Sequence, residues 1–494
     1  MPKKPNIPDP RNASFADWQE SVTNALNGRI NRLVSYSVVG GGGGQGGVTT
    51  IQNDGVDLPD EPNINIIGDV TIEDDPDNNR TNIYINDAPG GGCPSGTPTG
   101  VVVGGYLSVV GDFAYPLSQA SSSDMDYVAV PVGGQLHNLY IYQSAAQSNG
   151  GTSLISAYEW FQQTSPDTPS AMGFRTQLIT TLYPTSVAGT YGNTTNCLHL
   201  SEGDSFSIHK QQIYNTTAAA TQGWAAEYAT DTKGSLMGSF GHGTVAAGTT
   251  YAGIYNSATQ VTHASETHTL FAFPFTGTVR KMYVSMDSNQ PGTGSLVVTL
   301  RKGTSLAGMA DTALTITVAS SGTSGIYTDR TNTVSVTAGD LGSFKIVNNA
   351  STVSGAIRGI ICEYVATSGN PDSMTGWAIT SSWTNQTQYG TFFTSLAKSA
   401  TEIFTPCPRA LTLSAPRLWV APPSGSPSFD VTYTVRKNGA DTTVILTFDE
   451  TSSDVLVTGT GTATFAKGDY MSLRVDSVVT SGNPEPRAFT CQIT

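Results

Sequence analysis

The segment NCLHLSEGDSFSI at residues 196–208 recurs as NTVSVTAGDLGSF at 332–344 and as ATFAKGDYMSL at 463–473. In each copy a stretch with strand-like alternation leads into a Gly-Asp pair, and a second such stretch follows. Glycine supplies the positive φ of a tight turn, and aspartate can accept hydrogen bonds from the nearby backbone. We therefore expect a turn between two strands at each copy, with structural roles for Asp204, Asp340 and Asp469; a metal or catalytic role is the alternative.

Other landmarks keep the order set by these turns. A proline precedes each turn at Pro131, Pro274 and Pro406, and a closing strand ends each unit at 224–228, 360–364 and 489–493. The second and third units share TLRKG at 299–303 and TVRKNG at 434–439, whereas the first has YEWF at 158–161. Recurrence of this kind indicates an internal repeat, and many short alternating stretches between Gly, Ser, Asn and Pro turns indicate antiparallel strands. The sequence predicts an all-β protein with three tandem antiparallel β-sandwich (jelly-roll-like) repeats, at 99–231, 232–367 and 368–494.

An N-terminal anchor is predicted over residues 1–50, with an amphipathic helix at 14–34 and a Gly-rich linker behind it. One apolar stripe follows the helix, with spacings of three and four residues, and we expect it to serve anchoring or oligomerisation: Phe15, Trp18, Val22, Leu26, Ile30 and Leu33. Packing on its own domain, trimeric self-association and docking into a partner are all open for this stripe.

The next segment, 51–98, is predicted to be an acidic β-hairpin region with a closing linker. Residues 51–90 hold ten acids and one base, which gives −9 of the total charge of −14. Strands are expected at 65–72 and 81–85, with the turn at 74–79. The turn DPDNN at 75–79 is similar to the start of a calcium loop but lacks that loop's glycine and final acid.

Composition narrows the class of protein. The 494 residues are only 13% charged, and the net charge of −14 argues against a nucleic-acid clamp, which needs a basic face. The sequence contains no run of about 18 apolar residues, so we expect no helix that inserts into a membrane. The odd count of five cysteines does not suggest a disulfide framework, so we expect reduced and mostly buried thiols. The first residues lack the hydrophobic region of a secretory signal, which leads us to expect release by lysis rather than export.

Motifs for catalysis are missing. The sequence holds no HExxH, G-x-S-x-G or phosphate-binding loop, and no third ligand joins His263 and His268. Glu159 and Glu227, beside Trp160 and Trp224, could form a glycosidase pair, but such a pair must face one cleft. We predict no catalytic residue, no metal and no cofactor, and therefore no enzyme.

The layout resembles that of a tailed-bacteriophage virion structural protein of the fibre or capsid-decoration (head fibre) type. A short attachment segment, Gly-rich linkers, the acidic hairpin at 68–85 and tandem Thr/Gly/Ser-rich units carry this resemblance over the whole chain. It implies a homotrimer bound to other virion proteins, capsid or tail, through its N-terminus. It also implies a place on the virion exterior after assembly in the host cytoplasm, with the β-modules displayed outward for contact with host surface glycans. No nucleic-acid partner is expected.

Other functions stay open at this point. The alternatives are a tailspike-type polysaccharide depolymerase, a receptor-binding tail fibre and a bacterial surface adhesin, the last disfavoured by the absence of a signal peptide.

Overall fold

The fold is all-β, as predicted. The computed structural model describes residues 36–39, 50–53, 56–57, 70–75, 80–85, 101–107, 113–114, 128–143, 153–162, 172–182, 189–212, 222–230, 234–254, 263–286, 288–367, 373–378, 386–390, 392–393, 399–449 and 455–494. Across these residues there are strands and two short 3-10 turns but no α-helix. The helix predicted at 14–34 lies outside them and stays a prediction.

The chain divides into two compact units, 1–91 and 92–494. In the first unit, β1 (Tyr36–Val39), β2 (Thr50–Asn53) and β3 (Val56–Asp57) form an antiparallel sheet. A hairpin is present there as well, because β4 (Val70–Asp75) pairs with β5 (Arg80–Ile85). Asp74 and Asp75, which the sequence predicts in the turn, belong to the first strand of this hairpin and pair with Thr81 and Arg80. Its turn, and with it the calcium interpretation, lies outside the described residues.

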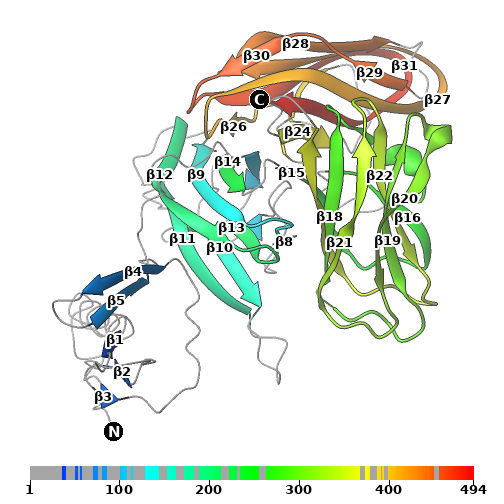
Figure 1. The fold of residues 1–494 in the computed structure, drawn as a ribbon. Coiled ribbons are helices and arrows are strands. Elements are labelled where there is room, and N and C mark those ends of the chain that lie inside the picture. The colour runs from blue at the N-terminus through cyan, green and yellow to red at the C-terminus, as the bar shows by residue number, and fades with distance from the viewer. Residues whose placement is uncertain are drawn as a thin grey trace, which may run out of the picture. The chain divides into compact units, whose positions relative to one another are not determined.

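The second unit consists of three groups of strands, which we call blocks 1, 2 and 3 (Figure 1). Block 1 comprises β6 (Val101–Leu107), β7 (Phe113–Ala114), β8 (Val128–Ala129), β9 (Gly134–Gln143), β10 (Ser153–Gln162), β11 (Met172–Leu182), β12 (Gly189–Leu200), β13 (Ser205–Gln212) and β14 (Gln222–Thr230). Block 2 comprises β15 (Gly234–Gly243), β16 (Gly248–Ala252), η1 (Glu266–His268), β17 (Phe271–Ala272), β18 (Gly277–Met286), β19 (Leu296–Gly303), η2 (Leu306–Gly308), β20 (Ala310–Val318), β21 (Gly325–Val336), β22 (Leu341–Asn348) and β23 (Ile357–Ala366). Block 3 comprises β24 (Ser373–Ala378), β25 (Thr387–Gly390), β26 (Thr405–Pro406), β27 (Leu411–Lys437), β28 (Ala440–Asp449), β29 (Val455–Thr458), β30 (Thr462–Phe465) and β31 (Tyr470–Ile493).

Blocks 1 and 2 have the same pair of antiparallel sheets. In block 1 the strand orders are β12-β9-β14-β6 and β11-β10-β13-β7, with β8 on β13. In block 2 they are β21-β18-β23-β15 and β20-β19-β22-β16, with β17 on β22. Each strand of one block therefore has a counterpart at the same place in the other.

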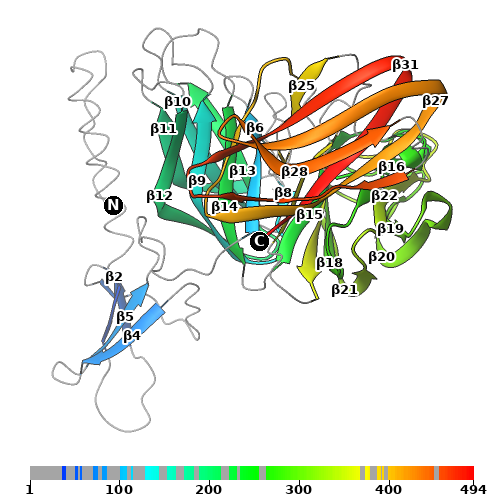
Figure 2. The same cartoon turned by 90° about the horizontal axis from the view of Figure 1, so that it is seen from above.

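Block 3 is a single eight-stranded sheet built around two long strands. Figure 2 shows β27 and β31 as long neighbouring strands in orange and red, and they pair with each other from Leu413–Ile493 to Lys437–Met471. Along β27 the register shifts at several points, and such irregularities let a strand bend. β24 and β25 pair with β31, whereas β28, β29 and β30 pair with β27.

Two local backbone features recur in the three blocks. Asn138, Lys281 and Ala415 have φ of +51°, +50° and +48°, an uncommon conformation for residues other than glycine. The three Gly-Asp turns also make the same backbone bonds, because the carbonyls of Asp204, Asp340 and Asp469 accept the amides of Val130, Phe273 and Cys407 at 2.7–2.9 Å.

These bonds correct one landmark. The prolines that follow Val130 and Phe273 are Pro131 and Pro274, so the matching residue of block 3 is Pro408, which follows Cys407, and not Pro406. Pro406 belongs to β26, which pairs with β31 and precedes Cys407 in the chain.

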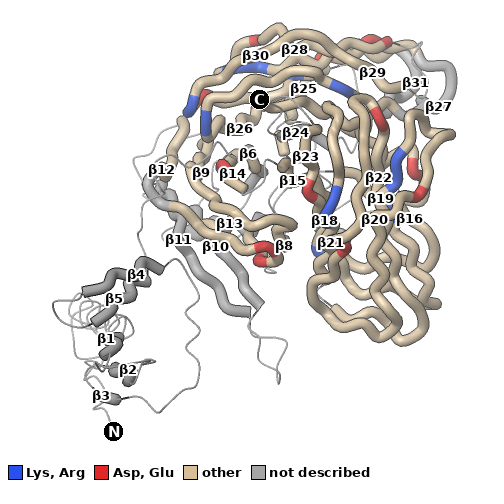
Figure 3. The backbone as a smooth tube through the Cα atoms, viewed as in Figure 1, with Lys and Arg blue, Asp and Glu red and all other residues tan. Residues whose placement is uncertain are grey.

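The core is built by strand alternation. In β28 the side chains of Val444, Leu446 and Phe448 are buried, and the residues between them are exposed. The bulkiest fully buried side chains come from all three blocks: Trp224, Tyr228, Tyr283, Tyr364, Tyr433 and Phe206. Charged residues are thinly scattered over the described backbone (Figure 3).

Candidate functional site

The predicted anchoring residues, Phe15, Trp18, Val22, Leu26, Ile30 and Leu33, lie outside the described residues. Their role stays a prediction. The structure instead informs the repeated polar positions of the second unit.

The Gly-Asp turns are structural, as predicted. Their glycines have φ of +95° at Gly203, +95° at Gly339 and +88° at Gly468. The carboxylates of Asp204, Asp340 and Asp469 accept the backbone N–H of the residue three positions earlier, at 2.6, 2.8 and 2.7 Å. The backbone N–H of each aspartate also donates to the carbonyl of that same residue, so one aspartate closes each four-residue turn through its side chain and its backbone.

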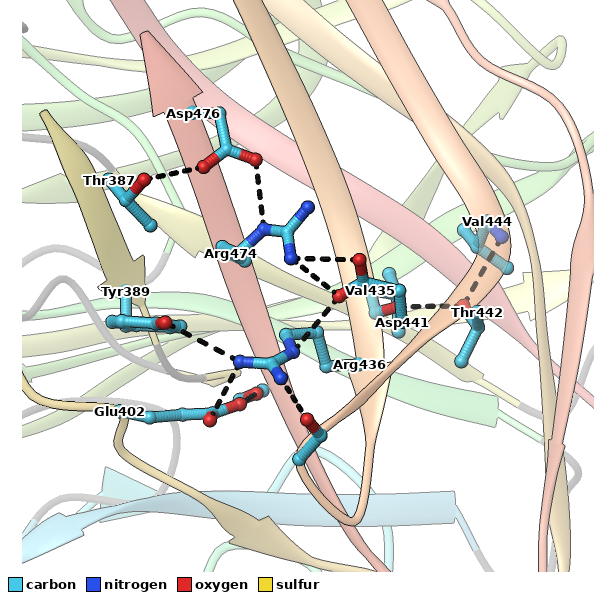
Figure 4. A network of polar contacts seen from close by, with 12 residues as sticks. Thr387, Tyr389, Glu402, Val435, Arg436, Asp441, Thr442, Val444, Arg474 and Asp476 are labelled. Carbon is cyan, nitrogen blue, oxygen red and sulfur yellow. Dashed lines mark hydrogen bonds and ion pairs between the residues drawn. The ribbon is translucent and has the colours of Figure 1, made fainter.

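A polar cluster lies in block 3 around Arg436 (Figure 4). Its guanidinium donates to Glu402 Oε2 at 2.8 Å, to the carbonyl of Gly439, and lies 3.1 Å from Asp441 Oδ1. Ser472 also donates to Glu402. We call Glu402, Arg436, Asp441 and Ser472 the arginine clamp of block 3. It fastens the segment before β26 and the β27–β28 hairpin to one sheet.

Block 2 contains the same clamp. Arg301 donates to Glu266 Oε1 at 2.7 Å and to the carbonyl of Met309 at 2.7 Å, and it pairs with Asp311. Ser343 donates to Glu266 as Ser472 does to Glu402. Both arginines follow a register shift in their strand, which indicates that a β-bulge aims each side chain at its partners.

A second base completes each clamp. Lys345 Nζ lies 2.8 Å from Asp311 Oδ2, and Arg474 Nη1 lies 2.8 Å from Asp441 Oδ2. Partial burial would raise the pKa of Asp311, but hydrogen bonds from Lys345 and Arg301 outweigh it and lower that pKa. Beyond the shared set, Arg474 also donates to Asp476 at 2.8 Å, and Asp476 accepts Thr387 at 2.7 Å.

Block 1 has no arginine at the position of Arg301 and Arg436. Arg301 and Arg436 pair with Ser343 and Ser472, and the residue that pairs with the corresponding Ser207 is Tyr158. The sequence pattern TLRKG/TVRKNG marked the arginines and the departure of block 1. It could not supply their acidic partners, since Glu266 and Glu402 lie 35 and 34 residues earlier, in the one-turn η1 and in a loop that have no periodic pattern.

The proposed glycosidase pair is not supported by the strand arrangement. Glu159 lies on β10 and Glu227 on β14, which belong to different sheets of block 1. The Glu227 side chain is buried, accepts Asn138 Nδ2 at 2.8 Å and lies 3.8 Å from Arg409 Nε. Its counterpart Glu363 is fully buried against Arg280. This position therefore holds a structural carboxylate, and the buried Trp224 is a core residue.

Histidines and cysteines fit structural roles where they are described. The rings of His263 and His268 lie 4.0 Å apart, but no group of three or more potential metal ligands occurs among the described residues. Cys362, Cys407 and Cys491 are buried free thiols, and burial raises the pKa of each. For these three residues the prediction of reduced, buried thiols is confirmed.

His137, on β9 of block 1, should make the free energy of unfolding depend on pH. Burial lowers its pKa, Lys467 lowers it further, and Glu227 opposes both. Since the unfolded chain takes up this proton more readily, the free energy of unfolding should fall as pH drops from about 7 to 5, by at most about 1.4 kcal/mol per pH unit.

Urea unfolding of the wild type and of His137→Gln at several pH values tests this expectation. The variant should show a flatter pH profile, and the exposed His199→Gln serves as the matched control. An unchanged slope in His137→Gln would show that this histidine titrates alike in both states.

In the described part of the chain, no helix has the length and apolar character that a membrane span requires. No protein-family model matches the sequence, and no curated protein matches it.

Proposed function

We propose that this chain is a structural protein of a tailed-phage virion, of the fibre or capsid-decoration type. Residues 1–50 anchor it to capsid or tail proteins as a homotrimer, and the 92–494 unit is displayed on the exterior. The division of the chain into two compact units supports a separate anchor and display region. The sequence layout, with its attachment segment and linkers, supports the virion assignment.

The display region, in this proposal, is three tandem repeats of one jelly-roll-like β-sandwich, at 99–231, 232–367 and 368–494. Shared strand orders, the +50° φ at Asn138, Lys281 and Ala415, and the three identical turns support the repeat. Such modules suit a protein that projects a rigid surface.

One observation carries the proposal of a structural role. The polar residues that blocks 2 and 3 have in common bond to one another within the chain, at Arg301 with Glu266 and Asp311 and at Arg436 with Glu402 and Asp441. Their shared chemistry therefore holds strands in place. In this proposal the exterior of the 92–494 unit contacts host glycans, and Asp441 and Asp476 remain 44% and 40% exposed although arginines hold both of them.

The anchor assignment predicts a defect in assembly without a defect in folding. Trp18→Ser with Leu26→Ser should leave the thermal unfolding of the protein unchanged but lower its amount in purified particles at least about tenfold, because each buried side chain contributes about 1.5–3 kcal/mol of docking energy. Quantitative blotting of particles measures this.

The matched control is Gln19→Ser with Asn24→Ser, which changes polar positions of the same predicted helix. It should join particles normally. Normal incorporation of the Trp18/Leu26 variant would refute the anchor.

A further inference from the structure

The first strands of the three blocks meet one another. β6, β15 and β24 hold the same edge position in their sheets, and each contacts the other two. A row of three blocks would bring only neighbouring first strands together. Three mutual contacts require block 3 to return to block 1.

The boundary from block 1 to block 2 shows how neighbours join. β8 of block 1 packs on β18 and β23 of block 2. Glu202, in the Gly-Asp turn of block 1, accepts Lys281 Nζ at 2.8 Å and the hydroxyl of Tyr283 at 2.7 Å. Lys281 is the residue with φ of +50°, so a turn of one block docks on the bulge of the next.

The boundary from block 3 to block 1, which we call the 3–1 boundary, repeats this arrangement. β26 of block 3 packs on β9 and β14 of block 1. Lys467 occupies the turn position of Glu202, donates to Asn138 Oδ1 at 3.1 Å and lies 5.7 Å from the centre of the Tyr140 ring. Asn138 is the bulge residue of block 1.

The boundary from block 2 to block 3 completes the set. β17 of block 2 packs on β27 and β31 of block 3, and Thr490 Oγ1 donates to the carbonyl of Ala272 at 2.9 Å. The three boundaries are thus built alike. In each, the short strand and the turn of one block pack on the sheet of the next block that contains its closing strand.

Side-chain packing matches as well. At the 2–3 boundary, Leu270 and Leu341 share a buried cluster with Trp419. The same places at the 3–1 boundary hold Phe404, Tyr470 and Tyr142, whose ring centres lie 4.6–4.8 Å apart. Aromatic contacts at this spacing are favourable, so the 3–1 boundary is packed as a true interface.

We infer that the three blocks close into a pseudo-threefold ring. In this ring, block 3 packs on block 1 through the same surfaces by which block 1 packs on block 2. This inference rests on the repeat part of the proposed function. The interfaces are of the head-to-tail kind, which forms a closed ring when the rotation between neighbours brings the last unit back to the first. One chain thereby takes the arrangement that three copies of a single block would form.

Permutation of the blocks tests the ring in a chain that keeps all three blocks and the N-terminal unit. The 2-3-1 chain joins residues 1–100 to 234–494, a six-residue Gly-Ser linker and 101–230. Blocks 1 and 2 are naturally joined through 231–233, and blocks 2 and 3 through 367–372, so a six-residue linker suits a third equivalent boundary. It spans at most about 20 Å and could not reach between the ends of an open row.

The matched control reverses the cyclic order. The 1-3-2 chain joins 1–233 to 373–494, a six-residue linker and 234–366. We expect the 2-3-1 chain to be folded and to unfold in one transition with a Tm within about 5 °C of the wild type, and the 1-3-2 chain to lose that transition. Both chains should be compared by calorimetry and by mass in solution.

Two results would overturn the ring: failure of the 2-3-1 chain to fold, or equal folding of both permuted chains, which would mean that the blocks are independent. If the 92–494 unit formed a concentration-dependent dimer by exchanging blocks between copies, block 3 would pack on block 1 of another chain. That result would contradict a ring closed within one chain. Since the readout is folding rather than particle assembly, failure here is distinct from failure of the anchor.

Discussion

Replacement of Arg280 by methionine should lower the free energy of unfolding by about 2 kcal/mol, because it removes the guanidinium, itself 33% exposed, that donates to a fully buried carboxylate. Glu363 is fully buried, and Arg280 donates to its two carboxylate oxygens at 2.7 and 3.1 Å. These hydrogen bonds raise the pKa of Arg280 and so favour the charged guanidinium. Urea or thermal unfolding measures the loss.

Two further variants separate the buried pair from general charge loss. Arg330→Met removes a 55% exposed side chain that pairs with Glu202 at 3.2 Å, and it should cost less than about 1 kcal/mol. Arg280→Met with Glu363→Leu removes both charges and should recover more than half of the loss. Equal losses for Arg280→Met and Arg330→Met would contradict the account of this position.

Replacement of Gly223 by alanine should open the 3–1 boundary. A Cβ atom at Gly223 would lie 2.0 Å from the carbonyl oxygen of Phe404, a backbone atom of block 3 that cannot swing aside. We expect a loss of about 3 kcal/mol, the upper end for overpacking. Faster amide exchange at 403–407 and 222–226 should accompany it.

Gly308→Ala is the matched control for this substitution. The nearest atom to its added Cβ would be the flexible Ser305 side chain at 3.2 Å, and we expect a change within about 0.5 kcal/mol. Unchanged exchange at the 3–1 boundary in Gly223→Ala would show that block 3 does not rest on this strand.

Much of the fold was predictable because its signals are local. Alternation and the Gly-Asp pairs predicted strands joined by turns, and the turns form through bonds that span only three residues, as at Asp340 and Thr337. The misplaced proline shows the limit of such signals. From the sequence alone, Pro406 and Pro408 are equally good matches to Pro131 and Pro274. Only the hydrogen bond from the Cys407 amide to the Asp469 carbonyl identifies Pro408 as the matching residue.

The polar clusters were less predictable because their partners are distant in sequence. Glu266 and Arg301 meet only after a loop and a strand are in place, and Lys467 meets Asn138 across 329 residues. The alternative of a Glu159–Glu227 pair depended on distant strands in the same way, because the two residues lie on different sheets of block 1. Nearness to tryptophan in sequence carried no information about which sheet each strand would join.

Immunogold labelling of intact phage particles with antibodies against residues 373–494 tests the central claim, external display from an N-terminal anchor, most directly. Our account predicts gold on the outside of wild-type particles and none on particles assembled with a chain that lacks residues 1–50. Intact wild-type particles without label, or equal labelling after the deletion, would contradict it.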